Sequence, residues 1–127
     1  MVKALFDTCI LIDYLNGIED AKHEFQLYED KAISVITWME VMVGTTEETE
    51  ALTKQWLESA FMVIGVNQRV SEAAVTYRKE KRVKLPDAII YSSSKCSDRL
   101  LVTRNTKDFK GDDPMVRVPY EIKPHIQ

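Results

Sequence analysis

Residues 2–17 read VKALFDTCILIDYLNG, and this stretch decides the fold class. Val2 to Phe6 is a short apolar strand that ends at an acidic residue, Asp7. A helix is predicted from Cys9 to Leu15, capped by Asp7 or Thr8, because short polar side chains accept hydrogen bonds from a helix's first N–H groups. Asn16-Gly17 is a helix-stop signal. A strand leading directly into a helix is the first half of a βαβ unit.

The rest of the chain repeats this alternation. Pro86 fits the first turn of its helix, Thr37 is the expected cap of another, and Leu52, Trp56 and Ala60 are expected to share one buried face. Strands are predicted over 32–35, 62–66, 100–102 and 115–118, and helices over 19–29, 37–44, 46–61, 68–82 and 86–96. Alternating strands and helices predict one α/β domain over residues 1–127, with a three-layer α/β/α architecture around a central, mainly parallel four- to five-stranded sheet.

The composition is that of a globular protein, with 45% hydrophobic and 29% charged residues among 127. The longest apolar run, 60–66, is far below the roughly 20 residues that span a bilayer, and Asp7 interrupts the N-terminal apolar stretch. We therefore expect a cytoplasmic protein with no membrane partner. Cys9 and Cys96 are expected to be reduced and buried, and His23 and His125 show no zinc-ligand spacing.

The net charge of −3 is unevenly distributed. Residues 1–66 carry 4 Lys+Arg and 12 Asp+Glu, whereas residues 67–127 carry 13 and 8. An acidic half suits a cation and a basic half suits a polyanion, although ordinary solvated faces explain the same pattern.

Three carboxylates stand out by their positions. Asp7 directly follows the first strand, Glu40 lies one turn into an apolar helix, and Asp87 follows Pro86 in the first turn of its helix. Helix capping and the helix dipole each explain one such acid. In a parallel sheet, however, residues that follow strands gather at the carboxyl edge, where ligands bind.

Carboxylates that converge repel one another unless a cation neutralises them. With neither Cys nor His in the set, the oxygen ligands favour a hard ion, Mg²⁺ or Mn²⁺, over zinc. Such an ion can polarise a phosphate and activate a water for in-line attack.

Four segments together resemble a known family. They are FDTCILID (6–13), SVITWMEVMVG (34–44), LPDAII (85–90) and LVTRNTKDF (101–109). In order, spacing and strand context they resemble the PIN-domain ribonucleases, and within that family the VapC-like toxins of type II toxin–antitoxin systems. The resemblance extends over essentially the whole chain.

This resemblance implies a Mg²⁺- or Mn²⁺-dependent endoribonuclease that hydrolyses RNA with a metal-activated water. It assigns metal binding and catalysis to Asp7, Glu40 and Asp87. The family often has a fourth acid where this chain has Asn105, which can ligate or hold a water but brings no charge. Asp108, one turn further on, either restores that charge or is a cap or surface residue.

The resemblance also implies supporting roles. The hydroxyls of Thr8 and Thr103 are expected to orient a carboxylate or a water, with capping as the alternative. Arg104 and Lys107 are candidates for holding RNA phosphate, with exposed solubilising charge as the alternative.

Toxins of this kind usually form homodimers and are silenced by a small antitoxin that wraps the toxin helices. The candidate contact residues are Trp38, Met39, Met42 and Trp56, for which core packing is the competing interpretation.

Two other phosphoryl-transfer folds lack their required acids here. A haloacid-dehalogenase-type site needs a second Asp where the chain has Cys9, and a response-regulator receiver needs an acceptor Asp at the third strand, which ends in Gly65-Val66-Asn67. The remaining alternative is a PIN-like module that binds RNA or protein with weak or lost catalysis.

Overall fold

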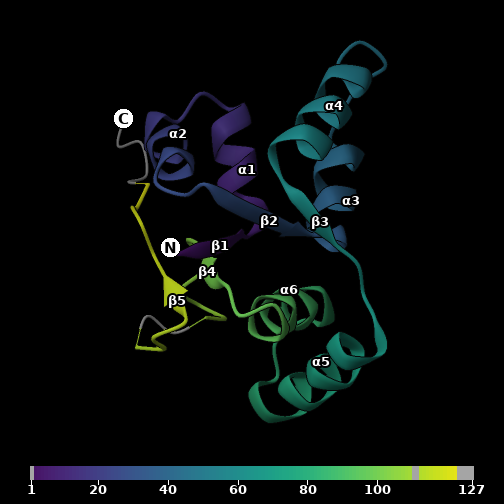
Figure 1. Cartoon of the computed structure of the whole chain (residues 1–127), viewed down its shortest axis with the longest axis vertical. Helices are drawn as coiled ribbons and strands as arrows, with labels where there is room; N and C mark the ends of the chain where they lie inside the picture. The colour runs from purple at the N-terminus through teal and green to yellow at the C-terminus, as the bar shows by residue number, and fades with distance from the viewer. Residues whose placement is uncertain (1, 110–111, 123–127) are drawn as a thin grey trace, which may run out of the picture.

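The computed structural model describes residues 2–109 and 112–122, and Figure 1 shows how they are arranged. One sheet contains the five strands in the order β3-β2-β1-β4-β5. These strands are β1 (Lys3–Phe6), β2 (Asp30–Ser34), β3 (Met62–Ile64), β4 (Leu100–Val102) and β5 (Val116–Arg117). Every neighbouring pair is parallel, so the carboxyl ends of all the strands lie at one edge of the sheet.

Helices cover both faces of this sheet. Figure 1 shows α1 to α4 on one face and α5 and α6 on the other. The first group is α1 (Thr8–Leu15), α2 (Glu19–Gln26), α3 (Val35–Val43) and α4 (Glu50–Ala60), and the second is α5 (Gln68–Lys81) and α6 (Leu85–Cys96). The predicted three-layer α/β/α fold is therefore confirmed, with a parallel sheet of five strands.

The central strand β1 contributes to a core on each side, because successive side chains of a strand point to opposite faces. Ala4 and Phe6 belong to the core under α1–α4, whereas Leu5 packs with Ile90 of α6 on the other face. Edge-to-face aromatic pairs fill the first core, with the Phe6 ring centroid 4.9 Å from that of Phe25. These packed layers fix the strand ends from which the site is built.

The start of α3 differs from the prediction. The sequence pattern predicts a strand to Val35 and a helix capped by Thr37, but Ser34 is the N-cap, and its Oγ accepts a hydrogen bond from the Ile36 N–H at 3.1 Å. Val35 already belongs to the helix, because tertiary packing overrides the strand preference of β-branched residues. Glu40 consequently lies in the second turn of α3, not at its N-terminus.

The α3–α4 hairpin is less buried than the pattern predicts. Leu57 is fully buried, but Leu52 is 72% exposed and does not share its face. The predicted start of the helix at Thr46 is also wrong, because the Thr46 N–H donates to Thr49 Oγ1 at 2.9 Å in a turn that precedes Glu50. Figure 1 shows the tip of this hairpin standing away from the sheet, which leaves the first turns of α4 without a covering layer.

Smaller differences between the predicted and observed bounds occur at the ends of other helices and strands. The helix predicted to run to Glu29 ends at Gln26, and the third strand ends at Ile64. Residues 119–122 form no regular element, and His125 lies outside the described residues. Over the ranges 2–109 and 112–122, no helix has the length and apolar character needed to cross a bilayer.

Candidate active site

Asp7 occupies the point where β1 becomes α1. Its backbone N–H extends the sheet by donating to the Val102 carbonyl at 2.9 Å, and its side chain caps α1 by accepting from the Thr8 N–H at 2.8 Å. The other carboxylate oxygen accepts from the Thr103 hydroxyl at 2.7 Å. Because Asp7 is only 5% exposed, burial raises the pKa of its carboxyl, and the charge of Glu40 adds to that rise against the lowering effect of these hydrogen bonds.

Glu40 reaches the same region from α3. The Thr8 hydroxyl donates to Glu40 Oε1 at 2.7 Å and lies 3.0 Å from the hydroxyl of the buried Thr37. The two predicted supporting hydroxyls thus donate hydrogen bonds to two of the three acids, Thr8 to Glu40 and Thr103 to Asp7. Glu40 Oε2 has no hydrogen-bond partner among the residues described, so it can face a cation or a water.

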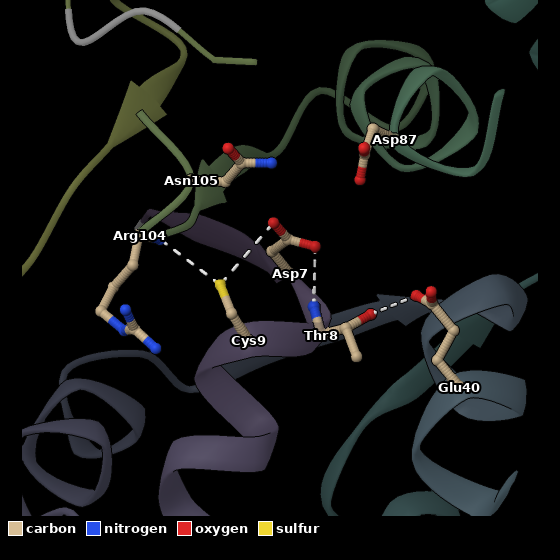
Figure 2. Close-up of a pocket in the computed structure, with 7 residues that line it drawn as sticks. All are labelled: Asp7, Thr8, Cys9, Glu40, Asp87, Arg104 and Asn105. Carbon is tan, nitrogen blue, oxygen red and sulfur yellow. Dashed lines mark hydrogen bonds between the residues drawn. The ribbon is translucent and has the colours of Figure 1, made fainter. Parts of the chain in front are cut away.

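Asp87 lies across the cleft, in the first turn of α6 behind Pro86, as expected. Figure 2 shows its carboxylate on the opposite side from Glu40, with Asp7 between them. Partial burial, the charge of Asp7, the proximity and charge of Asp108 and the charge of Glu40 together raise the pKa of Asp87 to about 6. The charges of Asp7 and Glu40 therefore make the ionisation of Asp87 less favourable.

These side chains line one open cleft of about 360 Å³, together with Cys9, Arg104 and Asn105. It lies at the carboxyl edge of the sheet, where α/β folds place ligands. The acids line the same cleft, but their carboxylates do not converge on one metal position. In the part of the chain that is described, no three Asp, Glu, His or Cys side chains lie close enough together to coordinate one metal ion.

A model of the PIN domain matches residues 4–111. The chain belongs to the PIN domain family. A solved toxin–antitoxin complex from Klebsiella pneumoniae contains a chain 47% identical to this PIN domain, with a TM-score of 0.89 over 94% of this chain and 100% of the other. No curated protein matches the chain.

More distant solved structures share the fold of this PIN domain. FitAcB from Neisseria gonorrhoeae is 20% identical, with a TM-score of 0.77 over 94% of this chain and 99% of that one. DNA-bound VapBC from Salmonella typhimurium is 23% identical, with a TM-score of 0.74 over 92% and 96%. The resemblance to PIN domains is therefore confirmed, and in fold it extends to the VapBC structure.

Asn105 and Asp108, the two residues considered for the expected fourth acid position, are hydrogen-bonded to each other. Asn105 Nδ2 donates to Asp108 Oδ2 at 3.1 Å, and the Asp108 N–H donates to Asn105 Oδ1 at 3.2 Å. Asn105 lines the acidic cleft, whereas Asp108 lines a neighbouring cavity. Asp108 nevertheless lies close enough to Asp87 to raise its pKa. Both interpretations of Asp108, as a replacement charge and as a cap, therefore remain predictions.

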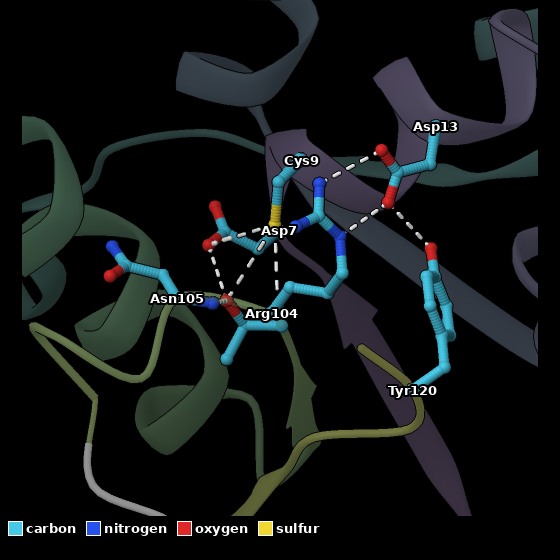
Figure 3. A network of polar contacts seen from close by, with 7 residues as sticks. Asp7, Cys9, Asp13, Arg104, Asn105 and Tyr120 are labelled. Atoms are coloured by element: carbon cyan, nitrogen blue, oxygen red, sulfur yellow. Dashed lines mark hydrogen bonds and ion pairs between the residues drawn. The ribbon is translucent and has the colours of Figure 1, made fainter. Parts of the chain in front are cut away.

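The two predicted phosphate-binding side chains lie in different places. The Arg104 guanidinium donates from Nε and Nη2 to both oxygens of Asp13, at 2.6 and 2.9 Å, and the Tyr120 hydroxyl donates to Asp13 Oδ2 at 2.8 Å (Figure 3). Nη1 of Arg104 has no hydrogen-bond partner among the residues that the structure describes. Lys107 is not in the acidic cleft and lines the neighbouring cavity instead.

Sequence reasoning missed three residues near the site. Asp13 is buried and holds Arg104, and an acid within the apolar run of α1 was the available signal, the same one that singled out Glu40. Thr37 supports Thr8, but it was interpreted as a cap. Cys9 is a free thiol on the cleft wall, where burial and the charge of Asp7 raise its pKa to about 11, so it stays a neutral thiol.

Proposed function

We propose that this PIN domain is a divalent-metal-dependent endoribonuclease and the toxin of a toxin–antitoxin pair. One observation carries the enzymatic part: Asp7 at the β1–α1 junction, Glu40 of α3 and Asp87 of α6 line one cleft. The pKa of Asp7 and of Asp87 is raised by burial and, in part, by neighbouring carboxylates. A cleft built from mutually repelling acids favours a cation.

The residues present fit a hard ion in their chemistry. All three acids offer oxygen, and oxygen is the ligand that Mg²⁺ and Mn²⁺ prefer. Cys9, the one soft donor on the cleft wall, is protonated. We propose that Asp7, Glu40 and Asp87 hold the ion, and that Asn105 contacts it or a water beside it.

A bound ion of this kind supplies polarisation of a phosphodiester and a more acidic water. The protein's own part is orientation. Thr103 and the Thr8 N–H fix both oxygens of Asp7, and the Thr8 hydroxyl fixes one oxygen of Glu40. Because these hydrogen bonds fix the carboxylates before the substrate binds, little reorganisation is needed at the moment of reaction.

The proposal is tested by incubating the purified chain with a mixed RNA pool and Mg²⁺ or Mn²⁺, then mapping the new ends by sequencing. We expect cleavage that EDTA abolishes and that excess metal restores. Asp87→Asn should remove cleavage while circular dichroism shows an unchanged fold. The matched control is Asp98→Asn, an exposed acid beyond the other end of α6, which should cleave normally.

Two results would contradict this assignment. Cleavage that persists in EDTA would remove the metal from the mechanism, and a fully active Asp87→Asn variant would remove Asp87. A folded protein that binds RNA but cleaves it in neither metal would instead support the alternative, a PIN-like binding module that has lost catalysis.

The toxin role has its own support and test. The chain 47% identical to this one occurs in a toxin–antitoxin complex, and α3 and α4 expose apolar side chains that a small antitoxin can cover, with Met39 44%, Leu52 72% and Val43 85% exposed. Of the expected contact residues, Trp38, Met42 and Trp56 instead pack partly against the core. Induced expression should arrest bacterial growth, and Asp87→Asn at the same level should not; equal growth would contradict the toxin role.

We further propose, from the family resemblance, that the protein acts in the cytoplasm as a homodimer. Light scattering of the purified chain is expected to give twice the mass of one chain. A single-chain mass at micromolar concentration would overturn the dimer without affecting the nuclease proposal.

A further inference from the structure

A second cavity of about 390 Å³ lies beside the acidic cleft, within the range of about 300–1,000 Å³ usual for small-ligand pockets. It is walled by Tyr77 of α5 and Tyr91 of α6 and floored by Val83 and Val116. Polar side chains complete the lining: Lys81, Lys107, Asp108, Asp112 and Asp113. Nothing in the proposed hydrolysis uses this cavity.

The aromatic wall is a rigid stack. The Tyr77 and Tyr91 rings lie 4.0 Å apart between centroids with 10° between their planes, and Phe109 continues the stack behind Tyr91 at 5.9 Å. The Tyr91 hydroxyl is fixed by donation to Asp113 Oδ2 at 2.6 Å. The Tyr77 hydroxyl, by contrast, has no hydrogen-bond partner within 2–109 and 112–122, so one polar group on this wall is available to a ligand.

One hydrogen-bonded residue pair links the linings of the two cavities. Asn105 lines the acidic cleft, Asp108 lines the second cavity, and the two are joined by hydrogen bonds of 3.1 and 3.2 Å. A ligand in the second cavity would therefore lie beside the cleft in which we propose that a phosphodiester is cut. This placement suits a nucleotide next to the scissile bond.

The charges favour a base over a phosphate inside the cavity. Three carboxylates line it, which disfavours a buried anion, but their oxygens can accept hydrogen bonds from the amino groups of a base. Lys81 and Lys107 are exposed and form no ion pair within the described residues, so they can meet the attached phosphate at the rim. Aromatic side chains next to a basic rim are typical of single-stranded RNA sites.

We infer that this cavity is a base-recognition subsite for the nucleotide adjacent to the cleaved bond, and that it prefers a base with an exocyclic amino group, adenine, cytosine or guanine, over uracil. The inference rests on the proposed RNA substrate. Its chemistry gives this PIN domain a base preference that the acidic cleft alone does not provide.

The direct test uses wild-type protein in EDTA and the four ribonucleoside 5′-monophosphates as probes, followed by NMR of the tyrosine rings. We expect the Tyr77 and Tyr91 resonances to shift, with tighter binding of AMP, CMP and GMP than of UMP. Tyr77→Phe removes only the free hydroxyl, and Lys107→Ala removes a rim charge. Each should weaken binding about three- to tenfold.

The matched control is Lys79→Ala. It removes an exposed lysine of α5, the helix that carries Tyr77, but one that does not line the cavity, so binding should be unchanged. Rings that no nucleotide shifts, a preference for UMP, or equal weakening by Lys79→Ala and Lys107→Ala would each overturn the inference.

RNA cleavage separates this inference from the proposed function. Nucleotide binding at the tyrosines without any cleavage would leave the subsite standing and refute the nuclease. Cleavage of the RNA pool with no base preference beside the cut, and with no shift of the tyrosine resonances, would support the nuclease and refute the subsite. If both hold, Tyr77→Phe should alter the mapped base preference while EDTA still abolishes cleavage.

Discussion

The Arg104 guanidinium holds the carboxylate of Asp13 through two hydrogen bonds, Nε to Oδ2 at 2.6 Å and Nη2 to Oδ1 at 2.9 Å. Asp13 lies on α1, about one turn beyond the cleft residue Cys9, and Arg104 lies in the loop that follows β4. That loop also carries Thr103, the donor to Asp7. The pair therefore ties the loop to the helix that Asp7 caps, and Figure 3 shows both ends of this connection.

Asp13→Asn is expected to lower the free energy of unfolding by about 1–3 kcal/mol, because it leaves Arg104 without its charged partner in a mostly buried position. Tyr120→Phe, which removes only one hydrogen bond to the same carboxylate, should cost about 0.5–1.5 kcal/mol. Urea unfolding followed by circular dichroism measures both. An Asp13→Asn variant no less stable than Tyr120→Phe would show that the ion pair adds nothing.

Thr103→Val tests the support of Asp7. Valine keeps the shape of threonine but removes the hydroxyl that donates to Asp7 Oδ2 at 2.7 Å and accepts from the Asn105 N–H at 2.9 Å. We expect cleavage to fall about 10- to 100-fold, as is typical when the partner of a metal ligand is lost. Thr103→Ser keeps the hydroxyl and should restore most of the activity. If valine and serine behave alike, the hydroxyl has no positioning role.

The sequence was informative where local pattern and topology agree. The strand-to-helix junction at Asp7 predicted where one acid lies, because parallel strands bring their carboxyl ends together. Pro86 predicted the start of the helix whose first turn carries Asp87. Glu40 was found by another route, as an acid that an apolar helix tolerates only if it faces solvent or a cation. The structure brings all three to one cleft.

What the sequence could not provide depends on distant contacts. Leu52 fits a buried helical face by spacing, but spacing does not reveal that the sheet ends before it, which leaves it 72% exposed. The pairing of Asp13 with Arg104 spans 91 positions, and no local rule predicts it. Lys107 was placed with Arg104 because they are close in sequence, yet the two residues line different cavities.

Asp87→Asn is expected to have opposite effects on stability with and without metal. In EDTA the variant should melt about 1–4 °C above wild type, since one of the mutually repelling carboxylates is gone. With Mg²⁺ or Mn²⁺ at millimolar concentration, wild type should gain stability through binding and the variant should gain much less. Asp98→Asn serves as the control and should gain as much from the metal as wild type does. An equal metal-induced gain in Asp87→Asn would contradict the ligand assignment.

The same carboxylates predict how stability depends on pH. An acid whose pKa is higher in the folded than in the unfolded state favours folding when protonated, so the metal-free protein should become less stable as pH rises from the ordinary value of 3.8 through about 6, the pKa of Asp87. Asp7 shifts in the same direction. Burial opposes the effect, but the hydrogen bond from Tyr91 lowers the pKa of Asp113. The ionised Asp113 therefore stabilises the fold at any pH above about 4, and this contribution is constant over the pH range of the experiment. Melting curves in EDTA from pH 7.5 to 5 should therefore show a rising melting temperature on acidification, and the rise should be smaller in Asp87→Asn. A flat profile, or one that is identical in the two proteins, would mean that these carboxylates do not repel one another in the folded state, and the need for a cation at this cleft would lose its basis.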